Sequence, residues 1–175
     1  MTKAKPDYPE INSIEALHRA LPGVYIAGKN LTVYRVHRCW MFSRALFNAI
    51  QKVDSTIHRV IGEFEVPKGA IIVKPKDKVD SWYGKEYFNK YRTDKLTFKR
   101  AVCFGRDSGK GMVELKLGNF KFDSLTTDPA QTKRKFTYKK GVMRTNKVDK
   151  DKYIGCSYGL HFYAKRRHAV KATIS

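Results

Sequence analysis

The residues best suited to bind a ligand lie in the last quarter of the chain, where cationic and aromatic side chains alternate. One such stretch is 133–140, and a second cationic run at 165–171 follows the apolar and aromatic stretch 158–164. Lysine and arginine attract phosphates whatever the base sequence, and exposed aromatic rings stack on unpaired bases. The pattern predicts a nucleic-acid interface. Its candidate phosphate-binding and base-stacking residues are Lys133, Arg134, Lys135, Phe136, Tyr138, Lys139, Lys140, Arg144, Tyr163, Lys165, Arg166, Arg167 and Lys171.

The distribution of charge supports this prediction. The 175 residues carry 36 basic and 16 acidic side chains, which gives a net charge of +20. Residues 131–175 hold thirteen of the basic and only two of the acidic side chains, whereas the charges of residues 101–130 cancel. A single charged run is usually a solvated surface, but an excess of +11 beside alternating aromatic residues favours a polyanionic partner.

The sequence favours RNA or single-stranded nucleic acid over duplex DNA as that partner. It contains no helix-turn-helix or zinc-finger pattern, and exposed aromatic side chains suit unpaired bases. Two other hypotheses remain open. The charge could instead bind an acidic host or viral protein or an anionic membrane surface. The protein could also be an enzyme that acts on NAD or nucleic acid, with Arg35, His37 and His161 near a pocket.

No motif in the chain predicts a catalytic residue set. The stretch Gly105–Gly111 (GRDSGKG) resembles a phosphate loop, but it has three residues where the motif needs four, and Lys110 is followed by glycine. A hairpin loop is the better interpretation. The glutamates end at Glu114, so the basic region has none for acid–base chemistry or metal-assisted hydrolysis. We therefore expect a protein that is not an enzyme.

Cysteine and histidine are too sparse to predict a metal site. Cys156, His161 and His168 have a loosely suitable spacing, but a structural zinc requires four ligands, and only Cys39 with His37 offers another pair. Neither a metal nor another cofactor is expected. The three cysteines are widely spaced and odd in number, which argues against a disulfide framework and favours a reducing compartment.

The elements that must position these residues are predicted to form a single α+β domain on a mostly antiparallel sheet with two or three short helices. Residues 1–11 are expected to be a flexible arm, and the domain spans 12–175 with its basic part at 131–175. A capping box of Asn12 and Glu15 begins a helix that Pro22-Gly23 ends. Further helices are expected over 39–53, 82–91 and 166–172, and turns at Pro67–Gly69 and Gly118-Asn119. Strands are expected over 31–38, 56–66 with a bulge at Gly62, 70–73, 112–117, 120–125, 136–143 and 159–164, whereas 96–104 fits a strand or a helix.

The hydropathy of the chain predicts no membrane span and no signal peptide. No stretch approaches the roughly 18 apolar residues that a spanning helix requires. The first ten residues are polar and include two prolines, unlike the apolar core of a secretory signal.

The last forty residues resemble a module of phage and large-virus proteins. Tyr138-Lys139-Lys140-Gly141-Val142 is followed, after a polar spacer, by Cys156-Ser157-Tyr158-Gly159-Leu160-His161-Phe162 and then by Ala169. This order is similar to the C-terminal part of the phage rapid-lysis rIIB protein, and Tyr91–Lys95 resembles the large-virus version of the module. The resemblance implies a viral protein, located in the host cytoplasm during infection, and it brings no assigned biochemical activity.

The first half of the chain also resembles ADP-ribosyltransferases. Tyr34-Arg35-Val36-His37 is similar to their early strand with Arg or His, and Val66–Ala70 (VPKGA) is similar to a turn of that family. The family has a later catalytic glutamate, and no glutamate follows Glu114 here. The resemblance therefore implies a related fold rather than the transferase activity.

Overall fold

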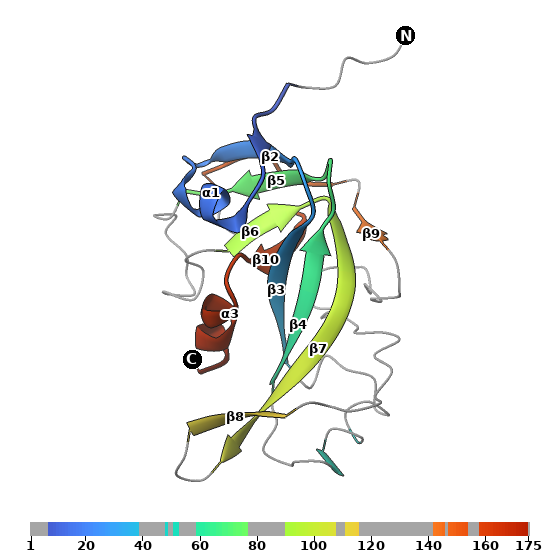
Figure 1. Cartoon of the computed structure of the whole chain (residues 1–175), viewed down its shortest axis with the longest axis vertical. Helices are drawn as coiled ribbons and strands as arrows, with labels where there is room; N and C mark the ends of the chain where they lie inside the picture. Colours follow the sequence, from blue (N-terminus) through green and yellow to red (C-terminus); the bar gives the residue numbers. More distant parts are fainter. Residues whose placement is uncertain are drawn as a thin grey trace.

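The computed structural model describes residues 7–38, 48, 51–52, 59–76, 90–107, 111–115, 142–145, 147–153 and 158–174. The helices whose bounds fall within these residues are α1 (Ile14–Arg19) and α3 (Arg166–Ile174), arranged around one large sheet (Figure 1). The strands are β1 (Glu10–Ile11), β2 (Gly23–Ala27), β3 (Leu31–Arg38), β4 (Arg59–Val66), β5 (Ile71–Lys74), β6 (Lys90–Thr93), β7 (Lys95–Asp107), β8 (Gly111–Leu115), β9 (Val142–Arg144) and β10 (Leu160–Tyr163).

The strands form one mixed sheet in a single α+β domain. Their order is β1-β2-β5-β6-β10-β3-β4-β7-β8, and β9 pairs with β7. The parallel pair β1–β2 lies at one edge, whereas the other described pairs are antiparallel. The expectation of an α+β domain is confirmed, but the sheet is mixed. The parallel pair includes residues assigned above to the flexible arm, because Ile11 pairs with Ala27 and is buried.

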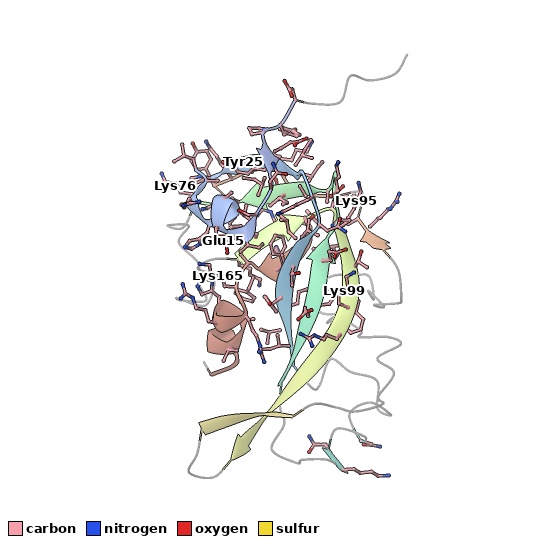
Figure 2. All side chains as sticks on the ribbon, viewed as in Figure 1. Glu15, Tyr25, Lys76, Lys95, Lys99 and Lys165 are labelled. Carbon is pink, nitrogen blue, oxygen red and sulfur yellow. The ribbon has the colours of Figure 1, made fainter. Side chains whose placement is uncertain are left out.

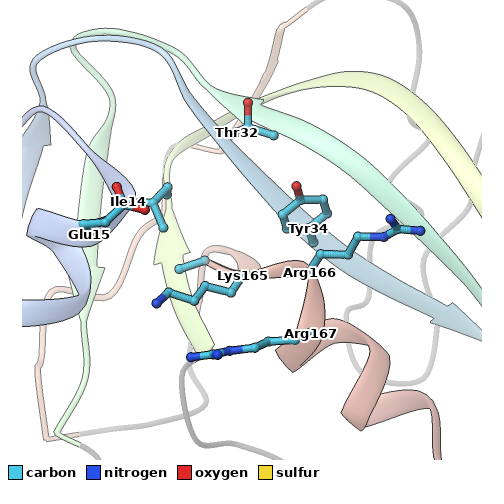
Figure 3. A pocket seen from close by; sticks show the side chains of 8 residues that line it. Ile14, Glu15, Thr32, Tyr34, Lys165, Arg166 and Arg167 are labelled. Atoms are coloured by element: carbon cyan, nitrogen blue, oxygen red, sulfur yellow. The ribbon is translucent and has the colours of Figure 1, made fainter.

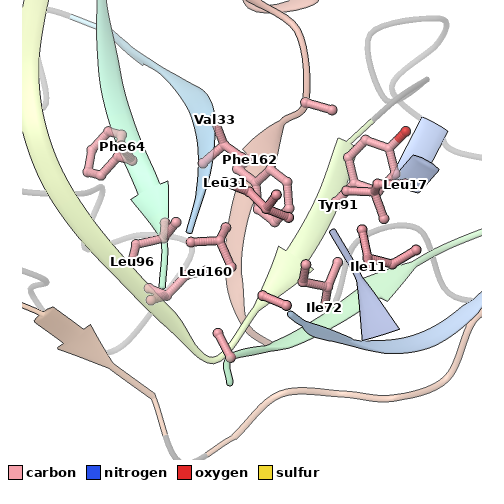
Figure 4. Packing of buried hydrophobic residues seen from close by; sticks show 14 residues of the cluster. Ile11, Leu17, Leu31, Val33, Phe64, Ile72, Tyr91, Leu96, Leu160 and Phe162 are labelled. Carbon is pink, nitrogen blue, oxygen red and sulfur yellow. The ribbon is translucent and has the colours of Figure 1, made fainter. Parts of the chain in front are cut away.

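The sheet curls so that one face, here called the inner face, encloses the main hydrophobic core (Figure 4). Residues opposite each other on neighbouring strands point to the same face. Phe162 lies opposite Tyr91, and their rings stack with centroids 5.5 Å apart. The buried members of this cluster are Ile11, Leu17, Ala27, Leu31, Val33, Phe64, Val66, Ala70, Ile72, Tyr91, Leu96, Leu160, Phe162 and Ala164.

Helix α3 packs on the opposite, outer face, over β3, β4 and β10. Its fully buried Ala169 forms a second cluster with Ile61 and Tyr163. Tyr163 lies opposite Tyr34 across β10 and β3, so both rings lie on the face that α3 covers. Because α3 begins three residues after β10 ends, the strand fixes where the first residues of the helix lie.

Helix α1 packs Leu17, which is fully buried, into the inner cluster. Its N-cap is Ser13, whose Oγ accepts a hydrogen bond of 3.0 Å from the Ala16 N–H, so the capping box predicted at Asn12 is wrong by one residue. At the other end, the buried Lys74 amine donates to Leu17 O at 3.1 Å and to His18 O at 2.6 Å. These bonds supply partners for carbonyls that a helix end leaves unpaired.

The described strands agree with the sequence over 31–38, 59–66, 71–73 and 160–163, and 95–107 is a strand rather than a helix. The helix expected over 82–91 is wrong at its end, because Lys90 and Tyr91 belong to β6. Strand β6 is short, and its core residue Tyr91 is followed by the buried Arg92. Its composition is therefore not that of an apolar strand. Most of 39–53 and 136–143, and all of 118–125, lie outside the described residues.

Two of the expected turns are confirmed. Gly69 has φ +77°, and the Ala70 N–H donates to Pro67 O at 3.0 Å. Asp107 pairs with Gly111, so GRDSGKG belongs to the β7–β8 hairpin. The sheet irregularity expected at Gly62 lies one residue later, between Glu63 and Phe64.

Candidate nucleic-acid interface

The segment after β9 runs across the outer face of β6 and β5, and hydrogen bonds to the sheet fix both of its ends. The Thr145 N–H donates to Asp94 O at 2.8 Å, next to the end of β6. The Lys76 N–H, just beyond β5, donates to Lys152 O at 2.7 Å. This part of the basic C-terminal region is therefore a second layer on the sheet.

Arg92 of β6 anchors the middle of this segment. Because Tyr91 points into the core, its neighbour Arg92 points to the outer face. The Arg92 side chain is fully buried, and its guanidinium donates to Asp151 O at 2.7 Å. Gly159 closes over it, because a Cβ at this residue would lie 3.2 Å from Arg92 Cβ and 3.3 Å from Val148 Cγ2. The segment thus depends on a buried cation and on a close approach of its own chain.

On this segment and next to it, the structure places lysines against tyrosines in a set that we name the Lys–Tyr strip. Tyr153 and Tyr158 are 59% and 70% exposed. Each lysine amine of the strip lies over a tyrosine ring at 5.2–6.0 Å from its centroid, a geometry of cation–π attraction. The members of the strip are Tyr8, Lys76, Lys147, Lys150, Lys152, Tyr153 and Tyr158.

The acidic residues of the segment are engaged with its backbone. Asp149 Oδ1 accepts a hydrogen bond from the Asp151 N–H at 2.9 Å, and Asp151 Oδ1 accepts one from the Tyr153 N–H at 2.8 Å. Such aspartates stabilise turns. None of the ion pairs among the described residues involves a lysine of the strip.

Lys99 and Arg100 of β7 differ in this respect, because they are paired with glutamates of β4. Lys99 Nζ lies 3.3 Å from Glu65 Oε2, and Arg100 donates two bonds to Glu63 Oε2 at 2.9 and 3.1 Å. Figure 2 shows Lys99 on the right of the molecule and Lys76 on the left. The ion pairs among the described residues therefore neutralise Lys99 and Arg100 but none of the lysines of the strip.

A second group of cations lies where β10 passes into α3. Lys165, Arg166 and Arg167 line an open hollow together with Ile14 and Glu15 of α1 and with Thr32, Tyr34 and Ala164 (Figure 3). Arg166 and Arg167 are exposed, and Lys165 is half-buried. In the sheet order β10 lies between β6, which underlies the strip, and β3, which lines the hollow. The two basic groups therefore flank one strand on the outer face.

The other predicted site residues have separate places. Arg144 is exposed at the end of β9. Tyr163 is only 7% exposed and packs under α3, so its ring contributes to the core and we leave it out of the interface. Lys171 lies in α3, but its side chain is outside the described part, as are all residues of the 133–140 stretch.

The exposed tyrosines and the lysines around them were missed in the sequence. The signal was present, because 147–158 holds three lysines followed by two tyrosines, a composition similar to the cations and aromatics of 133–140. Two aspartates interrupt this stretch and made it resemble a salt-bridged loop. Only the structure shows that their carboxylates bind backbone N–H groups.

The residues proposed for an enzymatic pocket are not gathered in the hollow. Arg35, His37 and His161 are absent from its lining, which takes Thr32 and Tyr34 from β3. Arg35 follows Tyr34 and so points to the other face of the strand. Within the described ranges, no group of three or more His, Cys, Asp or Glu side chains could bind a metal ion.

Comparison with known proteins yields one viral relative. No family model matches the chain. No solved structure matches it either. The chain is 28% identical over 161 residues to an uncharacterized protein of Acanthamoeba polyphaga mimivirus. The matched region covers 87% of this chain and 90% of that protein. In the part of the chain that the structure describes, no helix is long and apolar enough to cross a membrane. The chain is thus similar along most of its length to a large-virus protein of unknown function.

Proposed function

We propose that this protein is a non-enzymatic, virus-encoded nucleic-acid-binding protein that prefers RNA or other single-stranded nucleic acid. The observation that carries the proposal is the Lys–Tyr strip, where each of two exposed tyrosine rings has a lysine amine over it. These lysines form no ion pair among the described residues. Lysines supply contacts to phosphates, and tyrosine faces stack on unpaired bases. Duplex DNA hides its base faces, so it would gain from the lysines only.

The proposal is tested by removing three cations from the strip and three from a matched control surface. The first variant is Lys147→Ala/Lys150→Ala/Lys152→Ala. The control is Lys95→Ala/Lys99→Ala/Arg100→Ala, which removes the same charge from residues that are ion-paired to acids. Binding to a fluorescent single-stranded 20-mer RNA is measured by anisotropy at several salt concentrations.

We expect the strip variant to bind RNA at least about tenfold more weakly, because it loses three contacts to phosphates. Each lost contact should also lower the salt dependence of binding. The control should stay within about threefold of the unmodified protein, since its cations are already neutralised. Equal losses of RNA affinity in both variants would show that the strip contributes only through the net charge of the protein. An unmodified protein that ignores RNA but binds anionic liposomes or an acidic protein would contradict the proposal.

A further inference from the structure

The hollow at the start of α3 combines groups of opposite charge on opposite walls. Lys165 and Arg167 extend side by side below it, and Glu15 reaches into it from α1 (Figure 3). Among the described residues, neither cation forms an ion pair with Glu15, so the hollow separates the charges by more than 4.0 Å. Arg166 leaves the same turn in the other direction, along Tyr34.

The remaining wall of the hollow comes from β3 and is partly aromatic. Tyr34 packs against the cluster of Ile61, Tyr163 and Ala169, and Thr32 adds a hydroxyl two residues earlier on the strand. The volume of about 530 Å³ lies within the usual range for small-molecule sites. The hollow opens to solvent, so its ligand can continue beyond it.

We propose that this hollow binds a terminal ribonucleotide that carries a phosphate monoester, and that this nucleotide is the end of the strand bound by the Lys–Tyr strip. Lys165 and Arg167 would bind the phosphate, because charge-assisted bonds to phosphate are strong. Glu15 would accept hydrogen bonds from ribose hydroxyls, as carboxylates do in dinucleotide sites. The base would lie against Tyr34. This inference rests on the proposed function, because it names which part of the strand enters the hollow.

The test compares single-stranded RNA 12-mers that differ only at their ends. One set carries a 5′-phosphate, one a 3′-phosphate and one hydroxyls at both ends. In two further sets the phosphorylated terminal nucleotide is replaced by a 2′-deoxynucleotide. Affinities are measured for the unmodified protein and for Arg167→Ala, Arg166→Ala and Glu15→Gln. Arg166→Ala is the comparison within the same turn, since it removes the same charge from a side chain that lines the hollow along Tyr34 rather than beside Lys165.

We expect one of the phosphorylated ends to bind about tenfold more tightly than the hydroxyl ends, because a monoester adds up to two charges that the two cations contact. Arg167→Ala should abolish this preference for the phosphorylated end. Arg166→Ala should lower the affinity for all RNAs alike and keep the preference. Glu15→Gln should keep the preference for phosphate but lose the preference for ribose over deoxyribose, which the 2′-hydroxyl provides.

The outcomes separate this inference from the function on which it rests. Equal binding of all ends by the unmodified protein, with RNA binding intact, would overturn the hollow as an end-binding site and leave the function standing. If no RNA binds, both fail. If 5′-AMP competes for the hollow as well as an oligonucleotide does, the strand end is excluded and a free nucleotide takes its place as the ligand.

Discussion

Single aromatic residues in this protein have very different exposures, and these decide which of them can meet a ligand. Tyr153 and Tyr158 are 59% and 70% exposed, whereas Tyr163 is 7% exposed and Tyr91 only 2%. Tyr91 lies between Lys90 and Arg92 in the sequence, and Tyr153 follows Lys152, so a charged neighbour does not separate buried from exposed tyrosines. Neighbouring strands and α3 cover Tyr91 and Tyr163, and such burial by distant parts of the chain is what local patterns do not reveal.

The exposed rings predict a test of base stacking. The double variant Tyr153→Leu/Tyr158→Leu keeps apolar side chains but removes the ring faces, and each lost stack should cost about 1–3 kcal/mol of binding free energy. The variant Tyr153→Phe/Tyr158→Phe keeps the faces and should bind single-stranded RNA as the unmodified protein does. Isothermal titration of both variants with a poly-U 12-mer measures the difference. Equal affinities for the two variants would exclude stacking on these rings.

Among the elements, the segment over β5 and β6 depends on one buried side chain of the strand beneath it. Arg92→Met fills the same space but removes the bond to Asp151 O. We expect the amides of 147–153 to lose protection from hydrogen exchange, and RNA affinity to fall about threefold or more, because the segment must then be ordered on binding.

The control for this prediction is Arg100→Met, which removes an exposed arginine of β7 that pairs with Glu63. Exchange in 147–153 should not change in this variant. Unchanged exchange in Arg92→Met as well would show that the two terminal hydrogen bonds suffice to fix the segment.

The sequence predicts the elements of this fold better than its site. The long alternating strands β3 and β4 follow directly from their residues, because their pattern is regular and their register is set by apolar pairs such as Val33 and Phe64. The helix α3 follows from its position after an apolar strand. The position of 147–153 on the sheet could not be predicted from the sequence, because it depends on the hydrogen bond between Arg92 and a carbonyl 59 residues away. Periodicity contains no information on such a contact.

For the molecule as a whole, the charge predicts a strong dependence of binding on salt. A chain of net charge +20 should bind any polyanion at low salt, so specificity must be measured at higher ionic strength. Replacing Lys165, Arg166 and Arg167 with alanine should flatten the slope of log K against log salt by up to about 2, at roughly 0.7 per phosphate of a single strand. An unchanged slope would exclude these residues from the interface.

The place of β10 in the sheet has a consequence for how the chain reaches its structure during synthesis. This strand comes last in the sequence, yet it lies between β6 and β3. In the described sheet it joins β1-β2-β5-β6 on one side to β3-β4-β7-β8 on the other. A nascent chain can pair β3 with β4 and β7 early, but the sheet closes only after residues 160–163 have left the ribosome. Until then two open strand edges face each other, and such edges favour association with other chains. Completion of the fold is thus a late, long-range step, and ribosomal pausing before residue 160 would lengthen the time for which these edges stay open.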